Sequence, residues 1–200
     1  PDGEGELELA FRQLKEKLEN EGLFDVAAKK EIPNLPKKIA LVTSATSAAL
    51  QDMLKVVKSR WRLSEIYIFD ALTQGESAPS SLIKALRRAD KYGVDVIVLA
   101  RGGGSKEDLW CFNDEGLARE IYATKTPVIS AIGHEIDYVI SDFVADRRSL
   151  TPSAAMLDLL PDEEAFFQYL DRLSDDLDSA LNLKITKKQN LLNLLLSKFS

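Results

Sequence analysis

Four segments in the middle of the chain have the short, continuous apolar composition of strands that are buried on both faces of a sheet. These segments are residues 38–43, 65–69, 94–100 and 127–132. Between them, apolar residues recur at three- and four-residue spacing, which predicts amphipathic helices. The predicted helices are residues 47–60, 80–92 and 113–124, and Gly93 ends the second one as a C-cap. This alternation favours an α/β fold with a doubly wound parallel sheet and flanking helices.

Helical patterns also lie on both sides of this α/β segment. Residues 6–21 have the spacing of an amphipathic helix, and a connector with two prolines follows as far as Pro36. Residues 152–160 predict a short helix. Beyond Pro161, a four-three-four spacing of apolar residues is typical of a coiled-coil seam or a helical hairpin. The spacing slips within residues 177–185, which leaves a stutter, a hairpin turn and missing residues as alternatives.

We therefore expect three parts. They are an N-terminal helix and connector (1–36), an α/β core (37–160) and a helical tail (161–200). The tail would serve self-association or partner binding.

The composition is typical of an intracellular globular chain. Its 200 residues are 45% hydrophobic, which is enough to bury a core. The single cysteine, Cys111, excludes a disulfide scaffold and a zinc cluster built from cysteines. No apolar run reaches the roughly 18 to 20 residues of a membrane span and no segment resembles a signal peptide, so we expect a cytoplasmic protein. The chain starts at Pro1 without methionine and stops inside a helical pattern, from which we expect a fragment.

The net charge of −6 bears on the substrate. Proteins bind nucleic acid through clustered Lys and Arg, so an acidic chain taken by itself favours an enzyme for a small substrate. A nuclease, however, needs only a local basic site, and strand binding can reside in a separate module. Both interpretations therefore stay open on charge.

Chemically unusual residues follow three of the predicted strands. In an open parallel sheet, ligands bind outside the carboxyl ends of the strands. The turns at those ends read Thr-Ser-Ala-Thr-Ser (43–47), Arg-Gly-Gly-Gly-Ser (101–105) and Gly-His-Glu-Ile-Asp (133–137). We expect the three turns to converge at one edge of the sheet and to form an active site.

The glycine-rich turn has the chemistry of a phosphate site. Its glycines permit positive φ and a close approach of the backbone, so that several N–H groups and the start of the next helix face one anion. Arg101 would add a planar guanidinium fork. The turn matches neither the Rossmann fingerprint nor a Walker loop. The alternative to a phosphate site is a tight strand-to-helix turn with a surface arginine. The residues predicted to bind phosphate are Thr43, Ser44, Gly102, Gly103, Gly104 and Ser105.

His134 is the only histidine in the chain and the candidate general acid or base. Asp137 or Glu135 would orient the imidazole and fix its tautomer. The structural alternatives are a core histidine and acids that cap a helix N-terminus. His134 and Asp137 are also ligands that a divalent ion such as Mg²⁺ can use, but two ligands do not define a metal site, so the cofactor stays open.

Three further features carry weaker predictions. Asp70 ends the second strand and is a candidate helper of the site. Trp110 and Phe112 have rings that can stack on a base, although such a pair beside a helix is more typical of a core. The Asp-Arg-Arg run at 146–148 is a candidate phosphate contact, with a solvated turn as the simpler interpretation.

Several long stretches carry a family resemblance. They are AFRQLKEKLENEGLFD, LPKKIALVTSATSAALQDMLKVVKSRW, RGGGSKEDLWCFNDEGLAREI and TPVISAIGHEIDYVISDFVADRRSLTPSAA. Over about residues 7–160, the chain resembles the large-subunit family of bacterial exodeoxyribonuclease VII. The resemblance places the family's functional residues on Asp52, Arg101, His134 and Asp137, and Asp52 is a candidate through the resemblance alone.

The resemblance also implies what the whole enzyme does. Members of the family degrade single-stranded DNA to oligonucleotides from both ends in the cytoplasm. They carry an N-terminal OB-type domain and a long helical C-terminal region that docks several copies of a small helical subunit.

We therefore predict hydrolysis of phosphodiester bonds in single-stranded DNA. The Arg101 turn would hold the scissile phosphate, and His134, oriented by Asp137, would activate water or protonate the leaving oxygen. Asp52 would position water or a metal. Two rival interpretations are an anion-binding α/β hydrolase for a small phosphorylated or nucleotide substrate and a non-catalytic scaffold whose tail recruits partners.

Overall fold

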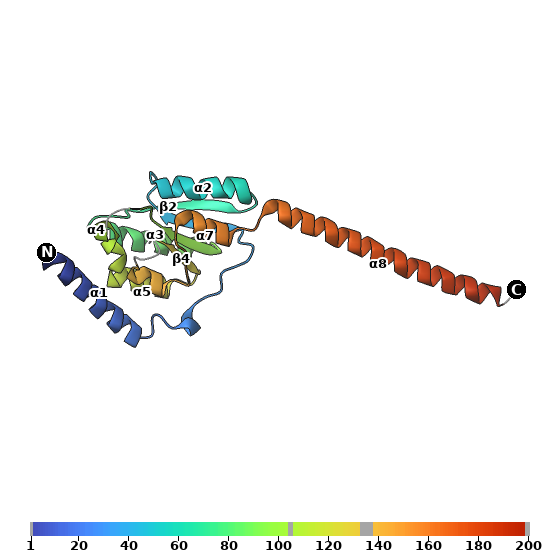
Figure 1. The fold of residues 1–200 in the computed structure, drawn as a ribbon, viewed down its shortest axis with the longest axis horizontal. Helices are drawn as coiled ribbons and strands as arrows, with labels where there is room; N and C mark the ends of the chain where they lie inside the picture. Colours follow the sequence, from blue (N-terminus) through green and yellow to red (C-terminus); the bar gives the residue numbers. More distant parts are fainter. Residues whose placement is uncertain (1, 104–105, 133–137, 199–200) are drawn as a thin grey trace. The chain divides into compact units, whose positions relative to one another are not determined.

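Five parallel strands form one sheet in the order β2-β1-β3-β4-β5 (Figure 1). The computed structural model describes residues 2–103, 106–132 and 138–198. The strands are β1 (Lys38–Thr43), β2 (Glu65–Asp70), β3 (Val96–Ala100), β4 (Val128–Ala131) and β5 (Arg147–Arg148). The alternation of these strands with helices confirms the predicted doubly wound α/β fold.

The strand order brings the functional turns to one edge. After β2 the chain crosses to the other side of β1 and adds β3 and β4 there, which makes the β1–β3 boundary a topological switch point. Thr43 is in register with Asp70, Val42 with Leu99, and Ala100 with Ala131. The carboxyl ends of these four strands therefore lie level, which places the turn after β1 beside the first residues that follow β3.

Helices cover both faces of the sheet (Figure 1). They are α1 (Asp2–Asn20), α2 (Ala48–Arg60), α3 (Ala78–Tyr92), α5 (Glu115–Ala123) and α7 (Pro152–Leu159). α2 packs against α7, and α3 packs against α5. Along β1, Ala40 and Val42 join the core that α3 and α5 line, whereas Ile39 and Leu41 alternate to the opposite face. All four side chains are fully buried, which explains the continuous apolar run in the sequence.

The end of α3 and the packing of α1 both follow from single residues. Gly93 has φ 78°, the left-handed conformation of a C-cap, and its N–H donates to the carbonyl oxygen of Asp90. Leu18 of α1 is fully buried in the core on the α3 side. Lys17 Nζ lies 2.8 Å from Glu115 Oε1, so α1 is tied to α5.

The segment between β3 and β4 is more divided than predicted. The helix predicted over 113–124 is present as α5, but α4 (Lys106–Leu109) and a 3-10 turn (Trp110–Asn113), which were not predicted, precede it. Asp114 separates the 3-10 turn from α5 because its carboxylate caps α5, accepting from the Leu117 N–H at 2.8 Å. The short helix α6 (Ile140–Val144) and strand β5 were not predicted, because neither is long enough to show a period.

The tail is one continuous helix, α8 (Glu163–Ser197) (Figure 1). No hairpin turn interrupts it between those residues, so the slip in apolar spacing lies within regular helix. Asp162 caps its start by accepting from the Ala165 N–H at 3.1 Å. The chain divides into two units, Pro1–Pro161 and Asp162–Ser200, and no described residue of the second unit is buried.

Across the described ranges, none of the helices combines the length and the apolar composition that a membrane crossing requires.

Candidate active site

The turn after β1 is held by its own hydroxyls and by Asp70. Ser47 caps α2, accepting from the Leu50 N–H at 3.1 Å, and its hydroxyl lies 3.3 Å from that of Thr43. Thr43 is fully buried. The Asp70 carboxylate accepts from the Ala45 N–H at 2.8 Å, so this residue acts on the turn from the neighbouring strand. Ser44 is half-buried, which makes it more accessible than Thr43.

Arg101 directly follows β3 and is almost fully buried, with 6% of its surface exposed. Its backbone N–H donates to the Ala131 carbonyl at 3.2 Å, which ties the turn after β3 to the end of β4. Its Nη2 atom lies 3.2 Å from Asp108 Oδ2 and 3.5 Å from Gln74 Oε1. The guanidinium is therefore held between the loop after β2 and the helix α4.

The second terminal nitrogen of Arg101 has a different environment. Nη1 is buried and has no hydrogen-bond partner among the described residues. An unpaired buried guanidinium nitrogen is costly, and such groups are normally satisfied by a carboxylate, a phosphate or water. A cation with a free N–H at the carboxyl edge of the sheet is suited to an anionic ligand. The alternative of a surface arginine at this turn is wrong, because Arg101 is buried.

Gly102 places the glycine-rich turn against the first turn of α2. A Cβ atom built on Gly102 would lie 3.7 Å from Ala49 Cβ and 3.8 Å from the Ala49 backbone nitrogen. Among the described residues, positive φ occurs only at Gly22, Gly75 and Gly93, so Gly102 and Gly103 do not use the left-handed region that the sequence suggested. The turn thus lies beside the N-terminus of α2, where the helix dipole favours negative charge.

Asp52 lies on α2, one turn beyond Ala49 and on the same side of the helix. Its side chain is half exposed and forms an ion pair with Lys55, Oδ1 to Nζ 2.9 Å. The pair links residues of successive turns on the surface, so it constrains Asp52 only weakly.

The remaining predicted site residues lie outside the part of the chain that the structure describes. These are Gly104, Ser105, His134, Glu135 and Asp137. The structure describes both flanks of the His134 turn, from Ile132 on one side and Tyr138 on the other.

A buried carboxylate fixes the far flank of that turn. The side chain of Asp142, at the start of α6, is only 1% exposed. It accepts from the Ser130 hydroxyl at 2.6 Å and from the Val139 N–H at 3.2 Å. Arg148 Nε lies 3.3 Å from Oδ2, the same oxygen that accepts from the Val139 N–H. We call Ser130, Asp142 and Arg148 the β4–α6 anchor, because they join the last strand before the His134 turn to the first helix after it.

Two further contacts support the anchor. The Asn113 side-chain oxygen accepts from the Ile140 N–H at 2.8 Å, and the Ser141 hydroxyl donates to the Phe112 carbonyl at 2.9 Å.

Arg148 also stacks on Tyr138, with Cζ 3.9 Å from the ring centroid. Arg148 is thus engaged inside the fold, and the simple solvated turn expected at 146–148 is wrong for this residue. The sequence carried no local signal for the anchor, because its members are brought together by the sheet.

Cys111 lies close to Arg101 but has the properties of a core thiol. Burial raises its pKa to about 11, although the positive charge of Arg101 opposes the shift. A thiol that stays protonated at neutral pH is a poor nucleophile.

Phe112 is fully buried, which confirms the core interpretation of that ring. Trp110 and Cys111 line a cavity of about 550 Å³ beside the loop that holds Gly75 and Glu76.

Residues 2–103, 106–132 and 138–198 contain no group of three His, Cys, Asp or Glu side chains that would hold a metal ion.

The sequence has been compared with known proteins. A model of the family described as exonuclease VII, large subunit, matches residues 23–200. The exodeoxyribonuclease 7 large subunit of Campylobacter fetus subsp. fetus (strain 82-40) is 63% identical over 195 residues, which are 98% of this chain and 50% of that protein. The protein of the same name from Campylobacter jejuni (strain RM1221) is 59% identical over 198 residues, 98% of this chain and 51% of the relative.

A third relative, the exodeoxyribonuclease 7 large subunit of Campylobacter hominis, is 56% identical over 191 residues, 96% of this chain and 49% of its own length. The chain spans about half the length of the curated relatives it matches. The family match covers most of the chain, and the parallel sheet carries a buried arginine at its carboxyl edge. The chain belongs to the exonuclease VII large-subunit family.

Proposed function

We propose that the chain carries the hydrolytic centre of an exonuclease that cleaves single-stranded DNA to oligonucleotides. The observation that carries the proposal is the guanidinium of Arg101, which is buried at the carboxyl edge of the sheet with one nitrogen unpaired. The three relatives are each named exodeoxyribonuclease 7 large subunit, which supports a phosphodiester substrate. A buried, preorganised cation stabilises the negative charge that grows on a phosphate during hydrolysis.

The division of labour follows from position. Arg101, the backbone of Gly102 and Gly103, and the start of α2 receive the scissile phosphate, with Ser44 at the rim. His134 transfers a proton between water and the leaving oxygen, and Asp137 orients its ring. Asp52 follows Ala49, the residue of α2 that Gly102 lies against, by one helical turn. It positions the attacking water or a divalent ion such as Mg²⁺. Gly104, Ser105 and Thr43 complete the turns that surround the phosphate.

The partners follow from the same assignment. We propose that the full enzyme works in the cytoplasm and binds a small helical subunit in several copies. Large apolar side chains are exposed along α8, among them Leu170, Leu173 and Leu177, and they form a surface suited to helix packing or self-association. The α/β core over residues 37–160 would then be the catalytic part and residues 161–200 the start of the docking part.

His134→Ala tests the proposal in the full-length subunit assembled with its partners. Loss of a general acid or base lowers rates by about 10² to 10⁴-fold. We expect kcat for single-stranded DNA to fall by at least about a hundredfold, while the Kd for the same strand stays close to that of the unchanged enzyme. An unchanged kcat in pure, folded variant would remove His134 from the mechanism and the proposal with it.

A further inference from the structure

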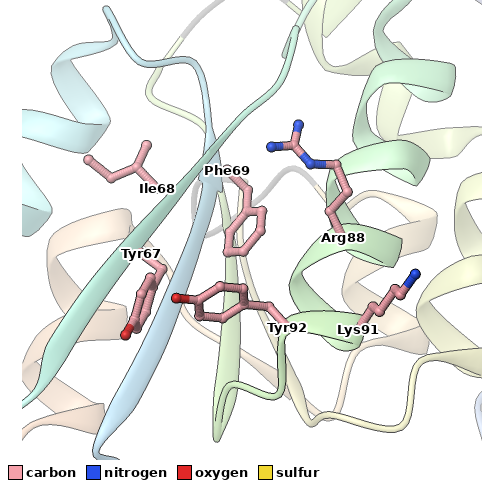
Figure 2. Close-up of a pocket in the computed structure, with 6 residues that line it drawn as sticks. All are labelled: Tyr67, Ile68, Phe69, Arg88, Lys91 and Tyr92. Carbon is pink, nitrogen blue, oxygen red and sulfur yellow. The ribbon is translucent and has the colours of Figure 1, made fainter.

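A groove between the edge strand β2 and the helix α3 lies outside the turns of the candidate active site. Tyr67, Ile68 and Phe69 line it from β2, and Arg88, Lys91 and Tyr92 line it from α3 (Figure 2). We call it the β2–α3 groove. Its volume is about 520 Å³, within the range of about 300 to 1,000 Å³ that small ligands occupy in proteins. The groove is therefore large enough to take one nucleotide unit.

Three aromatic rings form the apolar part of the groove. The centroid of the Tyr92 ring lies 4.6 Å from that of Tyr67 and 6.1 Å from that of Phe69. Figure 2 shows the Tyr92 side chain reaching from the end of α3 toward the strand. Phe69 is 7% exposed and Tyr92 is 53% exposed, so the Tyr92 ring is open to solvent and packs in an edge-to-face arrangement with the buried Phe69 ring. An exposed ring with buried support is suited to stacking against another planar group.

Two cations border these rings. Arg88 Cζ lies 5.8 Å from the Phe69 ring centroid, and Lys91 follows on the same helix (Figure 2). Neither forms an ion pair with any described residue. The chain as a whole has a net charge of −6, yet the six residues that line the groove include two cations and no carboxylate. This local positive charge attracts anions to a surface that is otherwise acidic.

Tyr67 does not oppose that charge. Its hydroxyl donates to the Glu65 carboxylate, and this hydrogen bond is the main reason that the pKa of Tyr67 is raised above its ordinary value. The raised pKa favours the neutral form of the phenol. A neutral phenol next to two cations is compatible with a phosphate in the groove.

The groove also leads to the candidate active site. Phe69 immediately precedes Asp70, whose carboxylate holds the turn after β1 through the Ala45 N–H at 2.8 Å. Tyr67 stands three residues before Asp70, which is about 10 Å along an extended strand. A strand that leaves the site over the end of β2 therefore meets the aromatic rings within a few nucleotides.

We propose that the β2–α3 groove binds a nucleotide of single-stranded DNA next to the scissile bond, with a base stacked on Tyr92 and Tyr67 and a phosphate near Arg88 and Lys91. This inference rests on the proposed function. Sequence-independent binding of single strands combines base stacking on aromatic rings with a positively charged groove, and both are present here. An added β-strand from a protein would use the free edge of β2 but would have no need for the two cations.

The test compares the double variant Arg88→Ala/Tyr92→Ala with the control Lys58→Ala/Tyr122→Ala in the full-length enzyme with its partners. The control removes the same kinds of side chain from α2 and α5, at positions where both are exposed. We expect the groove variant to raise the KM for single-stranded DNA about tenfold with kcat within about twofold. The control should leave both parameters within about twofold, and so should Tyr92→Phe, which keeps the ring.

Cross-linking supplies a second measurement. A strand that carries 5-iododeoxyuridine is bound to the His134→Ala enzyme and irradiated, and we expect covalent attachment at Tyr92 or Tyr67. If the groove variant kept its KM while the His134→Ala enzyme was inactive, DNA binding in the groove would be overturned. The proposed function would still stand. Loss of the small subunit with unchanged DNA affinity would also overturn it, because the groove would then be a protein interface.

Discussion

Arg101 Nη2 lies 3.2 Å from Asp108 Oδ2, while Nη1 of the same buried guanidinium has no partner among the described residues. Asp108 thus holds one side of the fork and leaves the other side available. This arginine lies at the carboxyl edge of the sheet, directly after β3, and the assignment of the active site depends on its unpaired nitrogen. The carboxylate is 41% exposed at its side chain, so solvent weakens its hold on the arginine.

Asp108→Asn should reduce catalysis more than stability. The amide keeps a hydrogen-bond acceptor near Arg101 but loses the charge that orients the guanidinium, so we expect kcat to fall about tenfold. Steady-state cleavage of single-stranded DNA measures this. Asp158→Asn, which neutralises an exposed acid of α7, serves as the control and should change kcat by less than about twofold. Equal effects of the two substitutions would show that Asp108 does not position the arginine.

Asp142→Ala should destabilise the fold strongly. The substitution leaves Arg148, whose side chain is 17% exposed, without its buried partner and removes the acceptor of the Ser130 hydroxyl and the Val139 N–H. We expect the free energy of unfolding to fall by about 3 kcal/mol. Chemical denaturation measures this quantity.

Arg12→Ala provides the matched control for Asp142→Ala. It breaks the ion pair between Arg12 and Glu8, whose side chains are 73% and 60% exposed. Such a pair contributes less than about 1 kcal/mol. If Asp142→Ala cost no more than Arg12→Ala, the β4–α6 anchor would not stabilise the chain.

The thiol of Cys111 should ionise at a higher pH than an exposed thiol. Its pKa is raised to about 11 by burial, from an ordinary value of 9.0. We expect the rate of alkylation by iodoacetamide in the native chain to rise with a midpoint near 11, and in urea with a midpoint near 9. The unfolded thiol ionises first as pH rises, so the contribution of this group to stability is complete below pH 9 and is lost as pH rises through about 11. A native midpoint near 9 would contradict the burial.

The sheet could be predicted from the sequence because its strands are buried on both faces. Ile39 to Val42 form an apolar run that is typical of a strand covered on both faces, and Gly93 directly follows the helical pattern that it caps. The helix α4 and the 3-10 turn over 106–113 were missed because each spans only four residues, which is too short to show a helical period.

The site was predictable only in part. Arg101 follows a strand and a glycine run, a local signal, but its contacts with Gln74 and Asp108 come from loops that the sheet brings together. The anchor residue Asp142 had no signal at all, since a buried aspartate looks like any other aspartate in a sequence. The β2–α3 groove was likewise invisible, because Tyr67 and Tyr92 lie 25 residues apart in the chain.

The kcat of Arg101→Lys in the assembled enzyme tests the central claim most directly. Lysine keeps the positive charge but lacks the planar fork, with which Arg101 would bind a phosphate through one nitrogen while the other contacts Asp108. We predict a fall in kcat for single-stranded DNA of at least about a hundredfold, with folding and strand affinity close to those of the unchanged enzyme. A kcat within about threefold of the unchanged value would contradict the account, because it would mean that the buried guanidinium takes no part in hydrolysis.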